Sequence, residues 1–146
     1  MFKIRYLFPF FFLLFTSNVN SQNHVTWVFS FDSTYSNIVV KGTIDKGWHL
    51  YSQKTQQNAG PIPVTVSFEK KKGLKLIGPY TEELVPHEIF DVNFDSQVYL
   101  FEDNYLAYQQ IKLKSNIELT GTINYMVCDD RQCLPPIDVP FSIQIK

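Results

Sequence analysis

Hydrophobic and polar residues alternate along most of this chain, and the alternation predicts a protein built from β-strands. In residues 25–31, Val25, Trp27, Phe29 and Phe31 fall on one face of an extended chain, because successive side chains of a strand point to opposite sides. No stretch of helical length repeats its apolar residues every 3.6 positions. The two-residue period predicts further strands at residues 38–44, 48–52, 64–68, 74–77, 97–101, 105–113, 117–127 and 137–145.

Segments rich in glycine, proline and charged residues separate these strands. Residues 45–47 and the lysine run at 70–73 are predicted to be solvated turns, and residues 53–61 a polar loop. Residues 78–95 contain two prolines and no regular period, so we expect a long surface loop there. About eight short strands with turns every 8–12 residues predict an all-β fold, an antiparallel sandwich of the immunoglobulin-like type.

The first 21 residues have the features of a secretory signal peptide. Lys3 and Arg5 precede an apolar run at residues 6–15, and short side chains then allow cleavage before Gln22. The apolar run has about ten residues, whereas a membrane-spanning helix needs about twenty. We therefore expect residues 22–146 to be exported and soluble, without insertion into the membrane.

The mature chain is long enough for one domain with a hydrophobic core. Loss of the signal peptide would remove two bases and no acids, leaving a net charge of about −3. No basic patch is evident, so nucleic acid is not an expected partner. The chain also lacks the glycine-rich strand–turn–helix motif of flavin and nicotinamide sites, and we expect no cofactor.

Cys128 and Cys133 are the only cysteines, and they lie at the tip of a predicted hairpin between residues 117–127 and 137–145. Neighbouring antiparallel strands are close enough for a disulfide across this loop. By chain entropy, a six-residue ring stabilises a fold by roughly 2 kcal/mol, whereas a hundred-residue loop contributes about 4.7 kcal/mol. The pair is therefore either a modest structural staple or a reversible redox couple, and both interpretations stay open on spacing alone.

A zinc site is a weaker interpretation of the same cysteines. Structural zinc takes four cysteine or histidine ligands, and beyond this pair the chain has only His24, His49 and His87, none at zinc-finger spacing. We expect no metal, and we expect His49 to be an ordinary strand histidine rather than a base.

Three stretches of the sequence carry a family resemblance. Residues 44–52 contain an aromatic-rich strand–turn–strand, residues 119–125 lead to the first cysteine, and residues 128–136 combine both cysteines with Pro135 and Pro136. In these stretches the chain resembles the N-terminal periplasmic domain of DsbD, the bacterial thiol:disulfide interchange protein.

The resemblance implies an immunoglobulin-like periplasmic domain that passes reducing equivalents through its two cysteines, as a protein-disulfide reductase does. Cys133 is the cysteine expected to form mixed disulfides, and Cys128 is the one expected to resolve them. The implied partners are exported thioredoxin-like proteins and a membrane-embedded thiol donor in another chain, in pathways such as cytochrome c biogenesis.

The resemblance also implies a cap loop that lays an aromatic ring over the cysteines. Here the matching stretch is residues 90–95, and Phe94 is the preferred cap, with Phe90 as the alternative and Asp91 beside them. Trp48 and Tyr51 are candidates for the wall of the site. All four aromatic residues have an alternative interpretation as core residues of the sandwich.

Charged residues within the cysteine motif are expected to tune the thiols. Asp129 and Asp130 raise a thiol pKa by like-charge repulsion, and Arg131 opposes them. Two rival functions remain open. One is an exported interaction module with an inert structural disulfide, and the other is a subunit that pairs a sandwich edge with another protein.

Overall fold

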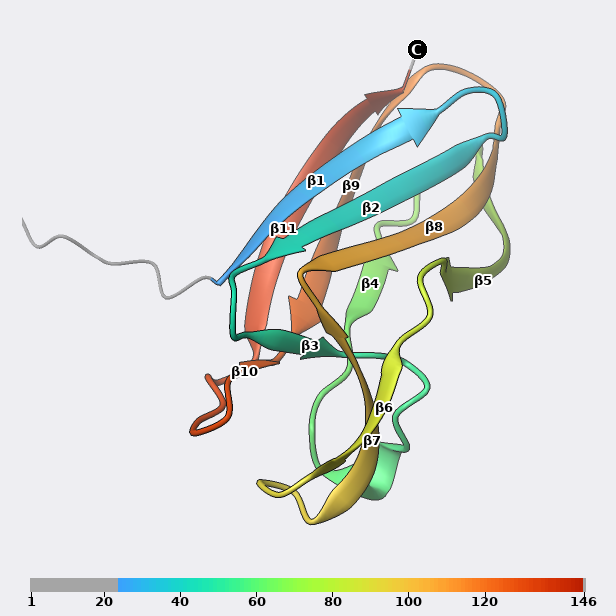
Figure 1. Ribbon diagram of the computed structural model, residues 1–146. Coiled ribbons are helices and arrows are strands. Elements are labelled where there is room, and N and C mark those ends of the chain that lie inside the picture. The colour runs from blue at the N-terminus through green and yellow to red at the C-terminus, as the bar shows by residue number, and fades with distance from the viewer. Residues whose placement is uncertain (1–23, 146) are drawn as a thin grey trace, which may run out of the picture.

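The alternating segments form an antiparallel immunoglobulin-like β-sandwich in the computed structural model, which describes residues 24–145 (Figure 1). The fold class predicted from the sequence is therefore confirmed. The predicted signal peptide, residues 1–21, lies outside the described residues. Within residues 24–145, no helix is both long enough and apolar enough to cross a membrane.

Two sheets make up the body of the sandwich. The first has the strand order β1-β2-β8-β5, from β1 (Val25–Asp32), β2 (Asn37–Ile44), β8 (Asn104–Leu113) and β5 (Leu74–Glu82). The second has the order β11-β9-β4, from β11 (Ile137–Ile145), β9 (Ile117–Tyr125) and β4 (Thr65–Phe68). Figure 1 shows the two sheets as separate layers.

The core forms where the inner faces of these two sheets meet. Ile38 and Ile111 of the first sheet lie in one apolar cluster with Leu119 and Phe141 of the second. Phe29 of β1 stacks on Phe141 of β11, with ring centroids 4.1 Å apart. Burial of these side chains is the main favourable contribution to the fold, at roughly 25 cal/mol per Å² of apolar surface.

A third sheet extends one end of the sandwich and carries the cysteines. Its order is β10-β3-β7-β6, from β10 (Val127–Cys128), β3 (His49–Tyr51), β7 (Ser96–Glu102) and β6 (His87–Asp91). Strand β7 leads into β8 through Asp103, which has a positive φ of 58°. Strand β9 leads into β10 through Met126 alone. The third sheet is thus connected directly to strands of both layers.

Most of the predicted strands are present close to their predicted bounds. Strand β11 matches the prediction residue for residue, and β2 begins one residue earlier than predicted. The predicted strand at 117–127 is interrupted at Met126, where the chain passes from β9 to β10. The predicted polar loop at 53–61 contains the 3-10 turn η1 (Gln57–Ala59), and Thr55 within it is buried.

The prediction of a long surface loop at residues 78–95 is wrong, because most of these residues are in strands. Strand β5 continues to Glu82 after an irregularity between Ile77 and Thr81, and β6 pairs along its whole length with β7. Four of the five residues of β6 are exposed, since it is an edge strand. An edge strand that buries no apolar side chain has no need for alternating apolar residues, so the two-residue period that marks other strands is absent here.

We predict that Val40→Ala lowers the free energy of unfolding by about 2 kcal/mol, because it removes two buried methyl groups and leaves a cavity. Val40 in β2 is fully buried, whereas Val28 in the neighbouring strand β1 is 55% exposed. The matched control Val28→Ala should change stability by no more than about 0.5 kcal/mol. Guanidinium denaturation measures both variants. Equal effects would contradict the assignment of β2 to the core.

Candidate functional site

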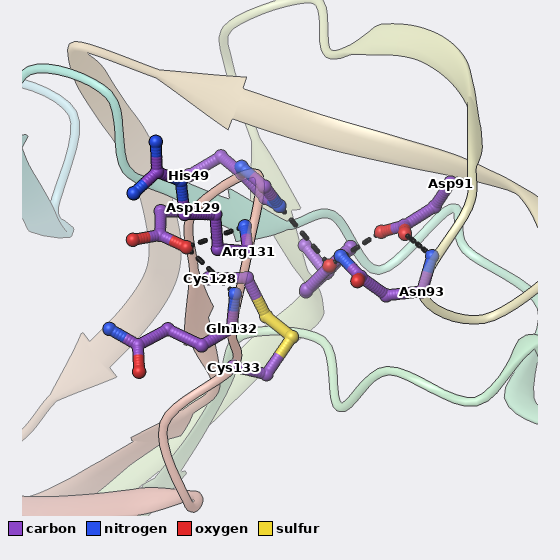
Figure 2. Close-up of a disulfide and its surroundings, with 9 residues drawn as sticks. His49, Asp91, Asn93, Cys128, Asp129, Arg131, Gln132 and Cys133 are labelled. Atoms are coloured by element: carbon purple, nitrogen blue, oxygen red, sulfur yellow. Dashed lines mark hydrogen bonds between the residues drawn. A yellow bond between two sulfur atoms is a disulfide. The ribbon is translucent and has the colours of Figure 1, made fainter.

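The two cysteines form a disulfide at the base of a short loop, as the hairpin prediction required. Their Cα atoms are 4.1 Å apart, and the pair is also a β-bridge. One carboxylate oxygen of Asp129 accepts hydrogen bonds from the backbone N–H groups of Arg131 and Gln132, at 2.7 and 2.8 Å (Figure 2). These bonds fold the four intervening residues into a tight turn.

The two sulfur-bearing residues differ in their exposure to solvent. Cys128, at the end of β10, is fully buried, whereas Cys133 is partly exposed. An incoming thiolate or disulfide from another protein can therefore reach Cys133 more easily than Cys128. This asymmetry matches the roles that thiol exchange needs, one accessible cysteine and one that acts only within the chain.

Cys128 is buried by an apolar cluster at the end of the sandwich. Its fully or nearly buried members include Tyr51 of β3 and Leu100 of β7, and Phe94 and Cys133 pack against them from the surface. The ring of Phe94 meets that of Tyr51 edge to face, at a centroid distance of 5.9 Å. The backbone at Gly60 allows this packing, because a Cβ there would lie 2.4 Å from the Phe94 ring.

Phe90 occupies a different position from Phe94. It lies on edge strand β6, is 54% exposed, and lines a cavity of about 220 Å³. His49 lines the same cavity, as do Asp129 and Asp130 of the cysteine loop. The hairpin of β6 and β7 therefore lies beside the cysteine loop, with Phe94 in the apolar cluster and Phe90 at the rim.

A chain of hydrogen bonds connects strand β3 to this hairpin. The hydroxyl of Tyr51 donates to Asp91 at 2.7 Å, and Nε2 of His49 lies 3.1 Å from the same hydroxyl. The other carboxylate oxygen of Asp91 accepts the backbone N–H of Asn93 at 2.8 Å, as Figure 2 shows. Asp91 is buried, so these bonds offset the cost of placing a carboxylate away from water.

Burial shifts the titration of both aromatic members of this chain. The pKa of Tyr51 is raised well above its ordinary range. Burial is the largest cause, and the hydrogen bond to Asp91 and the charge of Asp91 add to it. Burial lowers the pKa of His49, although the charges of Asp91, Glu102, Asp130 and Asp129 act in the opposite direction. Tyr51 therefore remains a protonated donor, and His49 is neutral at pH 7.

The other motif residues lie at or near the surface. The pKa of Asp129 is lowered, so its carboxylate stays ionised. The backbone hydrogen bond from Arg131 is the largest cause, and the one from Gln132 acts in the same direction. Asp130, Arg131, Pro135 and Pro136 are exposed. How these charges act on the thiols remains a prediction.

Trp48 is separated from the cysteines by its position just before β3. Its ring stacks on that of His24 at a centroid distance of 3.7 Å and packs against the core of the sandwich. Tyr51, in contrast, lies in the cluster that contains Cys128. The structure thus brings Tyr51, Asp91, Phe94 and the two cysteines together and leaves Trp48 apart.

Sequence reasoning overlooked His49 as part of the site. The signal was present, because residues two positions apart on a strand share a face and Tyr51 was already a candidate. Within residues 24–145, no three histidine, cysteine, aspartate or glutamate residues are grouped so that they could hold a metal ion.

We predict that the protein loses stability as the pH falls below about 6.5, the ordinary pKa of histidine. The folded state holds the pKa of His49 below that value, so the unfolded state binds more protons in this range and acid favours unfolding. His49→Gln should weaken this pH dependence, and His87→Gln, an exposed control, should not. Denaturant titrations at pH 5, 6, 7 and 8 give the free energy of unfolding at each pH. The same dependence on pH in the wild type, His49→Gln and His87→Gln would contradict the prediction.

Known proteins share both this fold and this sequence pattern. The family model of the thiol:disulfide interchange protein DsbD, N-terminal, matches residues 18–144. Among curated protein sequences, none matches the chain. The solved structure of the reduced DsbD N-terminal domain from Neisseria meningitidis is similar, with a TM-score of 0.63 at 15% identity, over 83% of this chain and 85% of that one.

Two further structures show the same fold. A complex of the DsbD N-terminal and PilB N-terminal domains from Neisseria meningitidis gives a TM-score of 0.62 at 12% identity, over 86% of this chain and 87% of that one. The N-terminal periplasmic domain of ScsB from Proteus mirabilis gives a TM-score of 0.54 at 12% identity, over 83% of this chain and 44% of that one. Since the family model covers most of the sequence, this chain belongs to the family of DsbD N-terminal domains.

Proposed function

We propose that this protein is a periplasmic thiol:disulfide exchange module, which receives reducing equivalents from a membrane-linked thiol donor and passes them to exported thioredoxin-like proteins. The observation that carries the proposal is the unequal exposure of the two cysteines in one short loop, Cys128 buried and Cys133 accessible. Family membership supports the same chemistry. Export through the predicted signal peptide, residues 1–21, would deliver the domain to a compartment where disulfides persist.

The exchange needs only the two thiols and a partner. In the reduced protein, the thiolate of Cys133 attacks the partner's disulfide, and one partner sulfur leaves as a thiolate. Cys128 then attacks the sulfur of Cys133, the mixed disulfide breaks, and the second partner sulfur leaves. The partner gains two electrons and two protons, and this protein loses them as its own disulfide forms.

Several features support a protein as the partner. One solved structure with this fold is a complex of a DsbD N-terminal domain with a PilB N-terminal domain. In the present chain, Ile89, Phe90 and Val92 expose apolar surface beside the cysteine loop. Apolar side chains around an accessible sulfur offer contact area to a docking protein, which a small thiol would not need.

We further propose Phe94 as the residue that shields the disulfide, with Phe90 as the alternative, and movement of residues 88–95 as the step that uncovers it. Phe94 packs on the cluster that includes both cysteines, whereas Phe90 is mostly solvent-exposed. The hydrogen bond that Tyr51 donates to Asp91 would hold the closed position, and the bond from the Asn93 N–H to Asp91 would keep the segment folded on itself. Opening would break the Tyr51–Asp91 hydrogen bond and the contacts of the Phe94 ring, and it would leave the two main sheets of the sandwich unchanged.

The cap assignment predicts different effects for the two phenylalanines. Phe94→Ala should increase the rate at which dithiothreitol reduces the disulfide, by about tenfold, since loss of roughly 1.4 kcal/mol of protection corresponds to that factor. Phe90→Ala, the matched control, should leave the rate within about twofold. Stopped-flow reduction under native conditions measures both. A larger effect of Phe90→Ala would transfer the cap role to Phe90, and no effect of either would remove it.

The exchange mechanism predicts opposite outcomes for the two cysteine variants. Cys128→Ser should accumulate a mixed disulfide between Cys133 and a partner, because the resolving thiol is absent. Cys133→Ser should form none, because its remaining thiol is buried. Non-reducing gels of cells that express each variant, followed by mass spectrometry, show the adducts.

The interaction-module alternative makes a different prediction for the same samples. If Cys128→Ser traps no partner and the wild-type disulfide resists millimolar dithiothreitol, the disulfide is a structural staple. The exported domain would then bind partners without exchanging electrons.

A further inference from the structure

His49 lies directly beside the buried cysteine of the disulfide. In the pairing of β10 with β3, Cys128 is opposite His49, and in the pairing of β3 with β7, His49 is opposite Glu102. Residues opposite one another in antiparallel strands point to the same face, with Cβ atoms about 4.5–5.5 Å apart. The imidazole and the Cys128 sulfur are therefore neighbours on one face of the third sheet.

The hydrogen bonds of Tyr51 determine which nitrogen of His49 carries a proton. The single hydroxyl proton of Tyr51 is donated to Asp91. At the 3.1 Å contact with His49, the hydroxyl oxygen must therefore accept, and Nε2 of His49 must donate. The neutral imidazole then holds its proton on Nε2 and has a free lone pair on Nδ1. Among the described residues, Nδ1 forms no hydrogen bond.

The charges that act on the pKa of His49 are all acidic. Tyr51 lies on its own strand, Glu102 on β7, Asp91 on the β6–β7 hairpin, and Asp129 and Asp130 on the cysteine loop. The negative charges favour a protonated imidazole, but burial outweighs them. His49, at 8% exposure, is thus neutral at rest and has counter-charges nearby when it gains a proton.

Cys128 has a chemical need that this arrangement meets. A thiol must lose its proton before it attacks a disulfide, and burial in apolar surroundings raises the pKa of a thiol. Cys128 is fully buried, and in the proposed exchange it must act inside the closed mixed disulfide, away from bulk solvent. A neutral base beside it would remove the proton without exposing the sulfur.

We propose that His49 is the base that accepts the proton of the Cys128 thiol in the resolving step, an inference that rests on the exchange function proposed above. The proton passes from the Cys128 sulfur to Nδ1 of the residue opposite it, directly or through one water. The Cys128 thiolate then attacks the sulfur of Cys133, and the bond from Cys133 to the partner breaks. The departing partner thiolate takes up the proton from the imidazolium, which returns His49 to its neutral state.

Single-turnover oxidation of the reduced protein by glutathione disulfide tests this role. Acid quenching and intact-mass measurement separate the reduced protein, the glutathione adduct on Cys133 and the internal disulfide, so decay of the adduct gives the rate of resolution. The variants are His49→Gln, which retains a side-chain donor for Tyr51 but cannot titrate, and His87→Gln as the exposed control. Cys128→Ser identifies the adduct that cannot resolve.

The proposal predicts a particular dependence on pH. Wild-type resolution should reach a plateau above about pH 6.5, because the base that limits it is a histidine with a lowered pKa. His49→Gln should be slower by about tenfold or more at pH 7 and should approach the wild-type rate near pH 9–10, where the thiol ionises by itself. His87→Gln should follow the wild type throughout.

Two results would overturn the role of His49 and leave the exchange function intact. One is a His49→Gln rate that is reduced equally at every pH, as a merely structural defect would give. The other is a wild-type rate that keeps rising to pH 8.5 or beyond, an observation that needs no variant and stands if His49→Gln does not fold. Failure of the wild type to form any adduct at Cys133, with glutathione disulfide or with a thioredoxin disulfide, would overturn both proposals.

Discussion

The pairing of β10 with β3 is the interaction on which the site depends. It consists of two residue pairs, Val127 with Leu50 and Cys128 with His49. Because side chains alternate across a strand, the first pair joins the core of the sandwich, and the second pair lies on the face that carries the disulfide. A slip of one residue would exchange the two faces, so the same apolar packing that stabilises the fold also fixes the position of Cys128.

The site combines residues of the paired strands β10 and β3 with residues of edge strand β6 and the turn after it. Cys128 lies in β10, which follows β9 through Met126 alone, and His49 lies in β3, which pairs with β10 and β7. Phe90 and Asp91, in contrast, lie on the exposed edge strand β6, and Phe94 lies in the turn after it. Strand β7 joins the two sides by pairing with β3. Residues 88–95 contact the cysteine side through the hydrogen bond from Tyr51 to Asp91 and through the packing of Phe94 on Tyr51. Such a division supports the proposed movement of residues 88–95 without loss of the sandwich, since local stability follows local packing.

Burial of one cysteine has consequences for the whole exchange reaction. In the proposed exchange it would direct partners to Cys133 and protect the internal sulfur, while apolar surroundings disfavour a thiolate at the buried position. Both proposals therefore follow from one structural fact. In the first proposal the accessible sulfur would meet partners, and in the second the neutral imidazole opposite the buried sulfur would help to complete the reaction.

The sequence alone determined two things: the strands that have one buried face, and the local hairpin that carries the cysteines. Strand β11 was predicted residue for residue, because burial of every second side chain forces a readable alternation. Strand β6 was missed because four of its five residues are exposed and the buried one is an aspartate. Its pairing with β7 depends on backbone hydrogen bonds that any residue can make. The tertiary structure decided that Asp91 meets Tyr51, forty residues earlier in the chain, and that His49 lies opposite Cys128. Contacts between distant strands depend on the register in which the strands pair and on where the β6–β7 hairpin folds back. No local pattern of residues encodes either of these.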